Sequence, residues 1–264
     1  MEERAEKGGG REVEEEEKGE DDDSVCLDES FFVNRNYELT TFTFGPHVLQ
    51  LLCLQSASTD YDLTGQLVWP GSVLLNNYLC KNMDMLDGRS VIELGSGVGI
   101  TGILCSRFCP KVVLTDHNDE VLEILKKNIE LQASSVPFDT AAEKLELTAE
   151  KLEWGNAEQI SRILQKHPSG FDIILGADIC FQQSSIPPLF STVEKLLRIH
   201  DGQCRFILSY VSRVKSMDVM VIEEALKHGM QIKEESGTRT MISNLEGVIF
   251  KITLDQNAAH VSRP

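Results

Sequence analysis

A short apolar segment followed by closely spaced glycines constrains the fold of this chain more than any other feature. Residues 91–94 (Val-Ile-Glu-Leu) are typical of a buried strand, and three glycines follow at alternate positions, Gly95, Gly97 and Gly99. Glycine has no Cβ, so a strand that turns into a helix through glycines lets a ligand approach the backbone. A second apolar segment, residues 112–115, ends in Asp116. Together these segments predict a mononucleotide-binding unit whose terminal acid accepts hydrogen bonds from ribose hydroxyls.

The charge beside the glycine turn favours S-adenosylmethionine over a nicotinamide dinucleotide as the cofactor. Glu93 lies inside the predicted strand, where a charge is costly unless it has a partner. A carboxylate there can reach the cationic methionine end of S-adenosylmethionine, whereas a pyrophosphate gains nothing from a negative neighbour. The alternative of a strand-to-helix turn that binds no ligand stays open at this point.

Charge and cysteine usage limit the partners and the compartment. The net charge of −17 repels nucleic-acid phosphates and suits a basic protein partner. Seven cysteines without a Cys-x-x-Cys pair indicate reduced, buried thiols and a cytoplasmic or nuclear protein. No apolar stretch approaches the roughly 20 residues that span a bilayer, so no membrane contact is expected. The histidines are scattered, so we expect no metal site.

Composition divides the chain into a domain and two tails. Residues 1–24 contain twelve acids and four bases and almost no large apolar side chains, which predicts a disordered acidic tail. We expect one domain over residues 25–255 and a flexible tail over residues 256–264.

Hydrophobic periodicity predicts an α/β fold. Residues 37–44 and 47–54 favour an antiparallel hairpin, and Ser72 is the expected N-cap of a helix that reaches Leu79. Residues 134–142 are expected to form a loop. The remaining expected strands are 90–94, 112–115, 145–149, 171–178, 205–210, 230–235 and 248–254, and the helices are 100–108, 120–132, 157–166, 186–198 and 217–228. This alternation indicates a mainly parallel sheet with helices on both faces.

Four separated motifs resemble those of the seven-β-strand, S-adenosylmethionine-dependent methyltransferases, specifically family 16 of the protein methyltransferases. They are residues 64–72 (Thr-Gly-Gln-Leu-Val-Trp-Pro-Gly-Ser), 93–99 (Glu-Leu-Gly-Ser-Gly-Val-Gly), 152–155 (Leu-Glu-Trp-Gly) and 178–181 (Asp-Ile-Cys-Phe). The resemblance implies a seven-stranded, doubly wound sheet in the order 3-2-1-4-5-7-6 with strand seven antiparallel. The hairpin is then an N-terminal extension of that fold.

The resemblance also implies a set of cofactor contacts, namely Trp69, Gly95, Ser96, Gly97, Asp116, Trp154 and Ala177. Cofactors bind at the carboxyl ends of parallel strands, where the first four strands are expected to end. Trp154 offers a large aromatic surface to the adenine. An alternative in which Trp69 and Trp154 are only packed core aromatics stays open.

Asp178 and Phe181 are the expected catalytic residues. Asp178 ends a continuous apolar strand, and its carboxylate would hold and orient a lysine ammonium while Phe181 narrows the channel. The alternative for Asp178 is an N-cap of the helix that follows. Phe181 lacks the hydroxyl of the tyrosine that is commoner in the family, so a role for that hydroxyl does not carry over.

We therefore expect a monomeric methyltransferase that moves a methyl group from S-adenosylmethionine to a protein side chain, with lysine as the first choice. Its substrate is expected to present a basic or lysine-bearing surface. Arginine or histidine acceptors are alternatives within the same class. A nicotinamide-dependent oxidoreductase and a non-enzymatic binding module with the same fold are alternatives from other classes.

Overall fold

A computed structural model describes residues 35–56, 61–133, 146–199 and 203–255. The two expected tails, residues 1–24 and 256–264, lie outside these residues. The expected loop over residues 134–142 lies outside them as well. The described residues belong to one compact unit that begins at Arg35. Among them, no helix is both long and apolar enough to cross a membrane.

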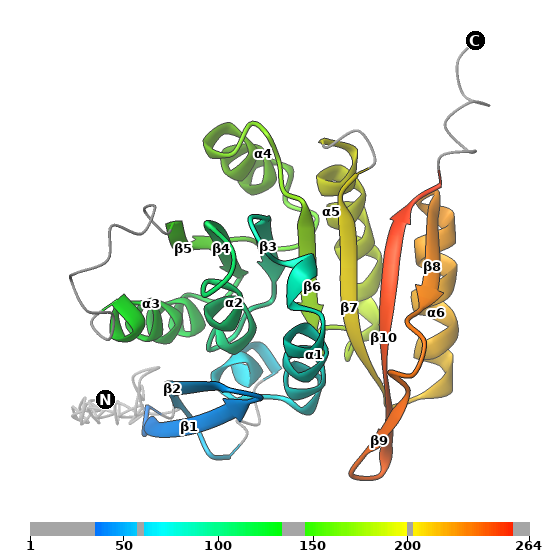
Figure 1. Cartoon of the computed structure of the whole chain (residues 1–264). Coiled ribbons are helices and arrows are strands. Elements are labelled where there is room, and N and C mark those ends of the chain that lie inside the picture. The colour runs from blue at the N-terminus through cyan, green and yellow to red at the C-terminus, as the bar shows by residue number, and fades with distance from the viewer. Residues whose placement is uncertain (1–34, 57–60, 134–145, 200–202, 256–264) are drawn as a thin grey trace, which may run out of the picture. The chain divides into compact units, whose positions relative to one another are not determined.

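The centre of this unit is a mainly parallel sheet (Figure 1). Its strands are β3 (Ser90–Leu94), β4 (Lys111–Asp116), β5 (Glu146–Lys151), β6 (Ile173–Ala177), β7 (Arg205–Ser212), β8 (Met230–Glu234), β9 (Thr240–Ile242) and β10 (Leu245–Leu254). Their order is β5-β4-β3-β6-β7-β10-β8, with β10 antiparallel to both β7 and β8. Counted from β3 and without β9, this order is 3-2-1-4-5-7-6, so the expected topology is confirmed.

Strand β9 was not predicted from the sequence. It has three residues, Thr240–Ile242, and pairs only with the beginning of β10. Three residues are too few to establish an alternating hydrophobic pattern, so only the pairing in the folded sheet defines this strand.

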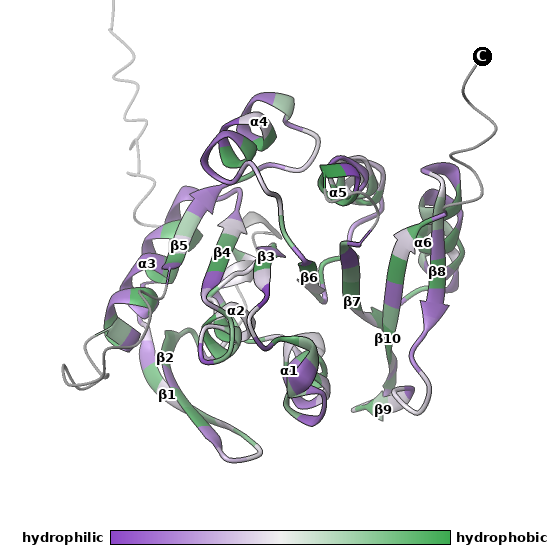
Figure 2. Ribbon diagram, turned by 45° about the horizontal axis from the view of Figure 1, so that its top comes forward, coloured by the Kyte–Doolittle hydropathy of each residue, from purple (hydrophilic) through white to green (hydrophobic). Residues whose placement is uncertain are grey.

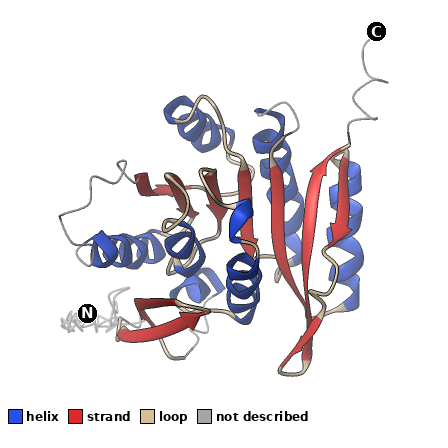
Figure 3. Ribbon diagram, in the orientation of Figure 1, coloured by secondary structure: helices blue, strands red, loops and turns tan. Residues whose placement is uncertain are grey.

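Helices cover both faces of the sheet (Figure 3) and enclose two hydrophobic cores. On one face lie α1 (Pro70–Lys81), α2 (Ile100–Cys105) and α3 (Asp119–Ala133). On the other lie α4 (Ala157–Lys166), α5 (Ile186–Ile199) and α6 (Lys215–Lys227). Figure 2 shows mostly hydrophobic residues along β7, whereas α3 and α4 carry both kinds of residue. A strand buried on both faces needs apolar side chains on both faces, but a surface helix needs only one apolar side.

The expected N-terminal hairpin is confirmed as β1 (Glu38–Phe44) and β2 (His47–Cys53), which form a separate antiparallel sheet. Asn128 of α3 attaches this hairpin to the domain. Its amide accepts from the Leu52 N–H at 2.8 Å and donates to the Leu52 carbonyl at 3.0 Å. The same amide donates to the Val98 carbonyl in the glycine turn at 2.9 Å. One buried side chain therefore connects the hairpin to the predicted cofactor loop.

The expected N-cap at Ser72 is wrong. Helix α1 begins at Pro70, with Trp69 in the N-cap position and no local side chain capping it. Proline is well suited to the first helical position because its fixed φ matches the helix. It lacks a backbone N–H, but an N–H at this position has no partner within the helix in any case. The helix therefore begins two residues before Ser72.

Candidate active site

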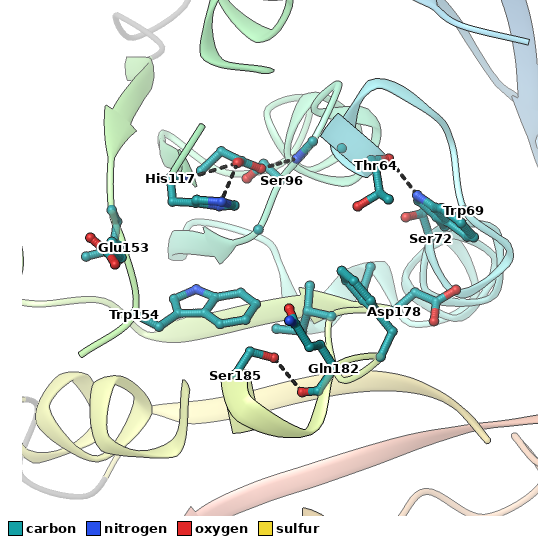
Figure 4. A pocket seen from close by; sticks show the side chains of 18 of the residues that line it. Thr64, Trp69, Ser72, Ser96, His117, Glu153, Trp154, Asp178, Gln182 and Ser185 are labelled. Carbon is teal, nitrogen blue, oxygen red and sulfur yellow. Dashed lines mark hydrogen bonds and ion pairs between the residues drawn. The ribbon is translucent and has the colours of Figure 1, made fainter. Parts of the chain in front are cut away.

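A pocket of about 280 Å³ lies at the carboxyl ends of β3, β4, β5 and β6 (Figure 4). Five chain segments that are far apart in the sequence meet there: residues 64–72, 95–97, 116–117, 152–154 and 177–188. Parallel strands place their carboxyl ends at one edge of the sheet, so the loops that follow them converge.

The glycine turn is shaped by packing against another backbone segment. Gly97 has a φ of +54°, and a Cβ on it would lie 2.6 Å from the carbonyl oxygen of Gly65. Gly65 belongs to the 3₁₀ helix η2 (Tyr61–Gln66). The sequence suggested that Gly97 is a glycine to admit a ligand. The structure shows that η2 occupies the space beside it.

Three N–H groups of the turn, those of Ser96, Gly97 and Gly99, are bonded within the protein. The Ser96 N–H donates to the Thr115 carbonyl at 2.8 Å, and the Gly97 N–H donates to Oδ2 of Asp116 at 3.1 Å. The Gly99 N–H donates to the Ser96 carbonyl at 2.8 Å. A pyrophosphate requires backbone N–H donors at such a turn and is repelled by a carboxylate. This donor set therefore disfavours a dinucleotide.

Asp116 is 7% exposed and lines the pocket at the end of β4. Its Oδ1 accepts from the backbone N–H of His117 at 2.8 Å and of Asn118 at 3.3 Å, and Oδ2 accepts from Gly97. A carboxylate has about four acceptor sites, so these three bonds leave capacity for a ribose hydroxyl. The acid that ends the second predicted strand therefore lines the pocket, and its ribose contact stays a prediction.

The structure does not bring Glu93 to the pocket wall. Its Oε2 accepts from the N–H of Gly102 at 3.0 Å, in the first turn of α2, where helix N–H groups lack partners within the helix. Burial raises the pKa of the Glu93 carboxyl to about 8. Glu93 therefore supports the helix behind the glycine turn rather than reaching into the space where a ligand would lie.

Both tryptophans of the chain line the pocket and remain partly exposed. Trp154 follows β5, and Trp69 precedes α1 and donates from its indole nitrogen to the Thr64 carbonyl at 2.8 Å. Figure 4 shows the two rings on opposite sides of the pocket. Trp154 also packs against one of the two hydrophobic cores.

Ala177 at the end of β6, and Asp178 and Phe181 after it, line the same pocket. Asp178 does not cap the helix that follows it. Its Oδ2 instead accepts from the N–H of Gly71 at 3.2 Å, in the first turn of α1, which lies earlier in the chain. Its Oδ1 forms an ion pair of 2.6 Å with Nη1 of Arg213.

Several residues at the site were missed from the sequence, and His117 and Arg213 are two of them. His117 lines the pocket directly after Asp116, and Arg213 contacts Asp178 from the end of β7. The available signal was position, because each residue follows a parallel strand at the edge where the other site residues lie. Periodicity alone does not reveal that His117 lines the pocket or that Arg213 contacts Asp178.

The sequence model of a protein family described as "Lysine methyltransferase" matches residues 51–226, which is more than half of the chain. The chain belongs to this lysine methyltransferase family. The resemblance suggested by the four motifs is therefore confirmed.

Several relatives of this family member carry names that state an activity. Protein-lysine N-methyltransferase EFM3 of Chaetomium thermophilum is 26% identical over 78% of this chain and 60% of its own length. Protein N-lysine methyltransferase METTL21A of Mus musculus is 32% identical over 60% of this chain and 65% of its own length. Histone-arginine methyltransferase METTL23 of Mus musculus is 32% identical over 51% of this chain and 48% of its own length. The chain thus spans less than two thirds of each of these relatives.

Proposed function

We propose that this chain is an S-adenosylmethionine-dependent methyltransferase that methylates a lysine side chain of a protein. The observation that carries the proposal is that Asp116, Trp154 and Asp178 line the same pocket. A ribose-binding acid and an aromatic surface for adenine meet there beside a carboxylate suited to an acceptor. Membership of the lysine methyltransferase family supports the same reaction.

The proposed cofactor contacts are divided between the two sides of the pocket. The Asp116 carboxylate would accept from ribose hydroxyls, and Trp154 would cover the adenine. The glycine turn, Gly95, Ser96 and Gly97, would lie against the remainder of the cofactor together with Trp69 and Ala177. Glu93 would not contact the cofactor but would fix the beginning of α2 through its hydrogen bond with the Gly102 N–H.

The proposed acceptor end consists of Asp178 and Phe181. When bound, S-adenosylmethionine supplies a methyl group activated by the positively charged sulfur. Asp178 uses one oxygen for Arg213 and the other for Gly71, and each oxygen keeps a further lone pair for an N–H of the acceptor. The Phe181 ring would limit the directions from which the acceptor enters, so that much of the rate enhancement comes from alignment.

The alternative acceptors and the alternative classes of protein are supported to different degrees. The name of METTL23 keeps an arginine acceptor as the second choice, and a histidine acceptor is the third. The internally bonded N–H groups of the glycine turn count against a nicotinamide dinucleotide. A non-enzymatic binding module would retain the fold and the cofactor pocket without transferring a methyl group.

One labelling experiment tests the proposal. The protein is incubated with tritiated S-adenosylmethionine and an extract of its own cells, and the labelled residue is identified by mass spectrometry. Label on lysine supports the proposal, and label on arginine or histidine changes the acceptor. A protein that binds S-adenosylhomocysteine but labels nothing is a binding module. Tighter binding of NAD than of S-adenosylhomocysteine in a parallel titration would overturn the cofactor assignment.

We also propose that the protein acts as a monomer in the cytoplasm or nucleus on a partner with a basic surface. Six cysteines of the described residues carry free thiols, as in a reducing compartment. The strongly negative net charge favours a basic partner. Light scattering measures the oligomeric state, and imaging of the tagged chain in its own cells tests the compartment.

A further inference from the structure

The carboxylate of Asp178 is held by groups from two elements other than its own strand. Nη1 of Arg213, after β7, donates to Oδ1 at 2.6 Å, and the Gly71 N–H at the beginning of α1 donates to Oδ2 at 3.2 Å. The side chain of Asp178 is 1% exposed and that of Arg213 is 25% exposed. A carboxylate buried to this extent requires a partner for its charge, and Arg213 supplies it.

The backbone of Asp178 shows how closely this position is constrained. Its φ is +59°, a left-handed conformation that aspartate and asparagine tolerate better than most residues. Gly71 leaves just enough room, since a Cβ on it would lie 2.6 Å from Cβ of Asp178. The carboxylate is therefore fixed where β6 ends, α1 begins and β7 ends.

Arg213 also contacts an aromatic ring that lines the pocket. Its Cζ lies 5.8 Å from the centroid of the Trp69 ring, within the range of a cation–π contact. Nη1 donates to the Val211 carbonyl at 3.3 Å as well. One guanidinium thus orients the proposed acceptor carboxylate and contacts an aromatic ring that lines the pocket.

We propose that Arg213 is a positioning residue that cancels the charge of Asp178, so that the site favours the acceptor lysine as a neutral amine. This inference rests on the proposed function. The amine nitrogen needs a free lone pair to form the new N–CH₃ bond. As that bond forms, the bond between the methyl carbon and the cofactor sulfur breaks with its electron pair left on sulfur, and the surplus proton goes to water.

The charge of the Asp178–Arg213 pair determines which form of lysine the site stabilises. An unpaired carboxylate would stabilise the ammonium, which has no lone pair, and would raise the pKa of the bound lysine. A carboxylate paired with a guanidinium can still accept an N–H without selecting the positive form. Arg213 therefore makes the carboxylate an orienting group rather than a trap for the ammonium.

Other titratable groups face the same region and stay constant in the test. Asp116, His117 and Glu153 line the pocket, and Cys180 and Tyr210 lie near the pair. Because none of them is changed in any variant below, differences between pH profiles report the changed pair.

The test is the pH dependence of methylation by Arg213→Gln, measured with tritiated S-adenosylmethionine and heat-treated cell extract at a concentration where the rate no longer rises. We expect the rising limb of the profile to move about one unit to higher pH, with about a tenfold lower rate at neutral pH, because a nearby positive charge is lost. Arg213→Lys should keep the limb in place at a reduced rate, since it keeps the charge but loses the planar fork. Arg162→Gln, which removes an exposed ion pair on α4, is the matched control and should match the wild type.

Two further variants separate charge from structure. Asp178→Asn leaves Arg213 uncompensated, so its limb should move to lower pH. The double variant Asp178→Asn with Arg213→Gln restores a neutral pair, so its limb should return to the wild-type position although its rate is low. These two variants also decide the question if Arg213→Gln alone does not fold.

Tryptophan fluorescence during S-adenosylhomocysteine titration checks every variant for an intact pocket, since both tryptophans line it. A uniform loss of rate with unmoved limbs in all folded variants would overturn this inference and leave the proposed function standing. A wild-type protein that binds no S-adenosylhomocysteine and labels no protein would instead overturn the proposed function itself.

Discussion

At the scale of single residues, Asp116 tests the cofactor assignment most directly. Asp116→Asn keeps one oxygen for the His117 and Asn118 N–H groups but replaces the other with an amide that cannot accept from Gly97. We expect S-adenosylhomocysteine to bind about 1–3 kcal/mol more weakly, the range for hydrogen bonds to a charged group. Isothermal titration measures the change.

The control for Asp116→Asn is Asp119→Asn. Asp119 is the first residue of α3, and its exposed carboxylate forms an ion pair with Lys151 of β5. The affinity of Asp119→Asn for S-adenosylhomocysteine should equal that of the wild type. Equal affinity in a folded Asp116→Asn protein would remove the ribose contact from the proposal.

Glu93 gives a prediction about pH and stability. Burial raises its pKa in the folded protein from 4.5 to about 8, so the folded state binds this proton more tightly than the unfolded state. Stability from this group is therefore fully present below about pH 4.5 and is lost as pH rises through about 8. Glu93→Gln mimics the protonated acid and should remove this loss.

The measurement for Glu93 is the melting temperature of wild type and Glu93→Gln at several pH values between 5 and 9, the window set by the two pKa values. The two proteins should melt alike at the acidic end, and the variant should melt higher at the basic end. Parallel pH curves would show that the carboxylate is not buried as the structure has it.

At the scale of elements, the contact between the glycine turn and η2 holds the pocket together. Gly97→Ala combines a left-handed backbone with a Cβ 2.6 Å from the Gly65 carbonyl, so η2 has to move away. We expect a loss of more than about 1–2 kcal/mol in stability, the cost of the left-handed conformation alone, and weaker S-adenosylhomocysteine binding. Thermal unfolding and titration measure the two effects.

Gly45→Ala is the matched control for Gly97→Ala. Gly45 has a φ of +56° in the turn between β1 and β2, and a Cβ there would meet nothing within 4 Å. It should therefore lose only the conformational part of the stability and keep the cofactor affinity. If both variants behave alike, the η2 contact does not shape the pocket.

At the scale of the whole molecule, the net charge of −17 determines how partners approach. Attraction between an acidic enzyme and a basic protein weakens as salt screens the charges. Raising sodium chloride from about 50 mM to about 300 mM should lower methylation at limiting substrate by on the order of tenfold. The labelling assay measures the rate, and S-adenosylhomocysteine affinity, which should barely change, is the control. A salt-independent rate would argue for an uncharged docking surface.

The sequence determined the order and type of the elements because strand and helix periodicities are local properties. Strand β3 and helix α4 have the expected bounds, Ser90–Leu94 and Ala157–Lys166. The glycine turn and Asp116 were also predictable, since a strand, a turn and a terminal acid lie within one short segment. Strand β9 was not, because only its partner β10 defines it.

Only the tertiary structure decided what the individual site residues contact. Glu93 turned toward α2, Gly97 toward η2, and Asp178 toward Gly71 and Arg213. These partners come from different parts of the chain, and Gly71 and Arg213 lie 107 and 35 residues from Asp178. Local sequence sets where a side chain stands along its strand, but the neighbours across the sheet edge are set by packing. The sequence motifs therefore predicted where the pocket lies, and only the fold determined which residues each site residue contacts.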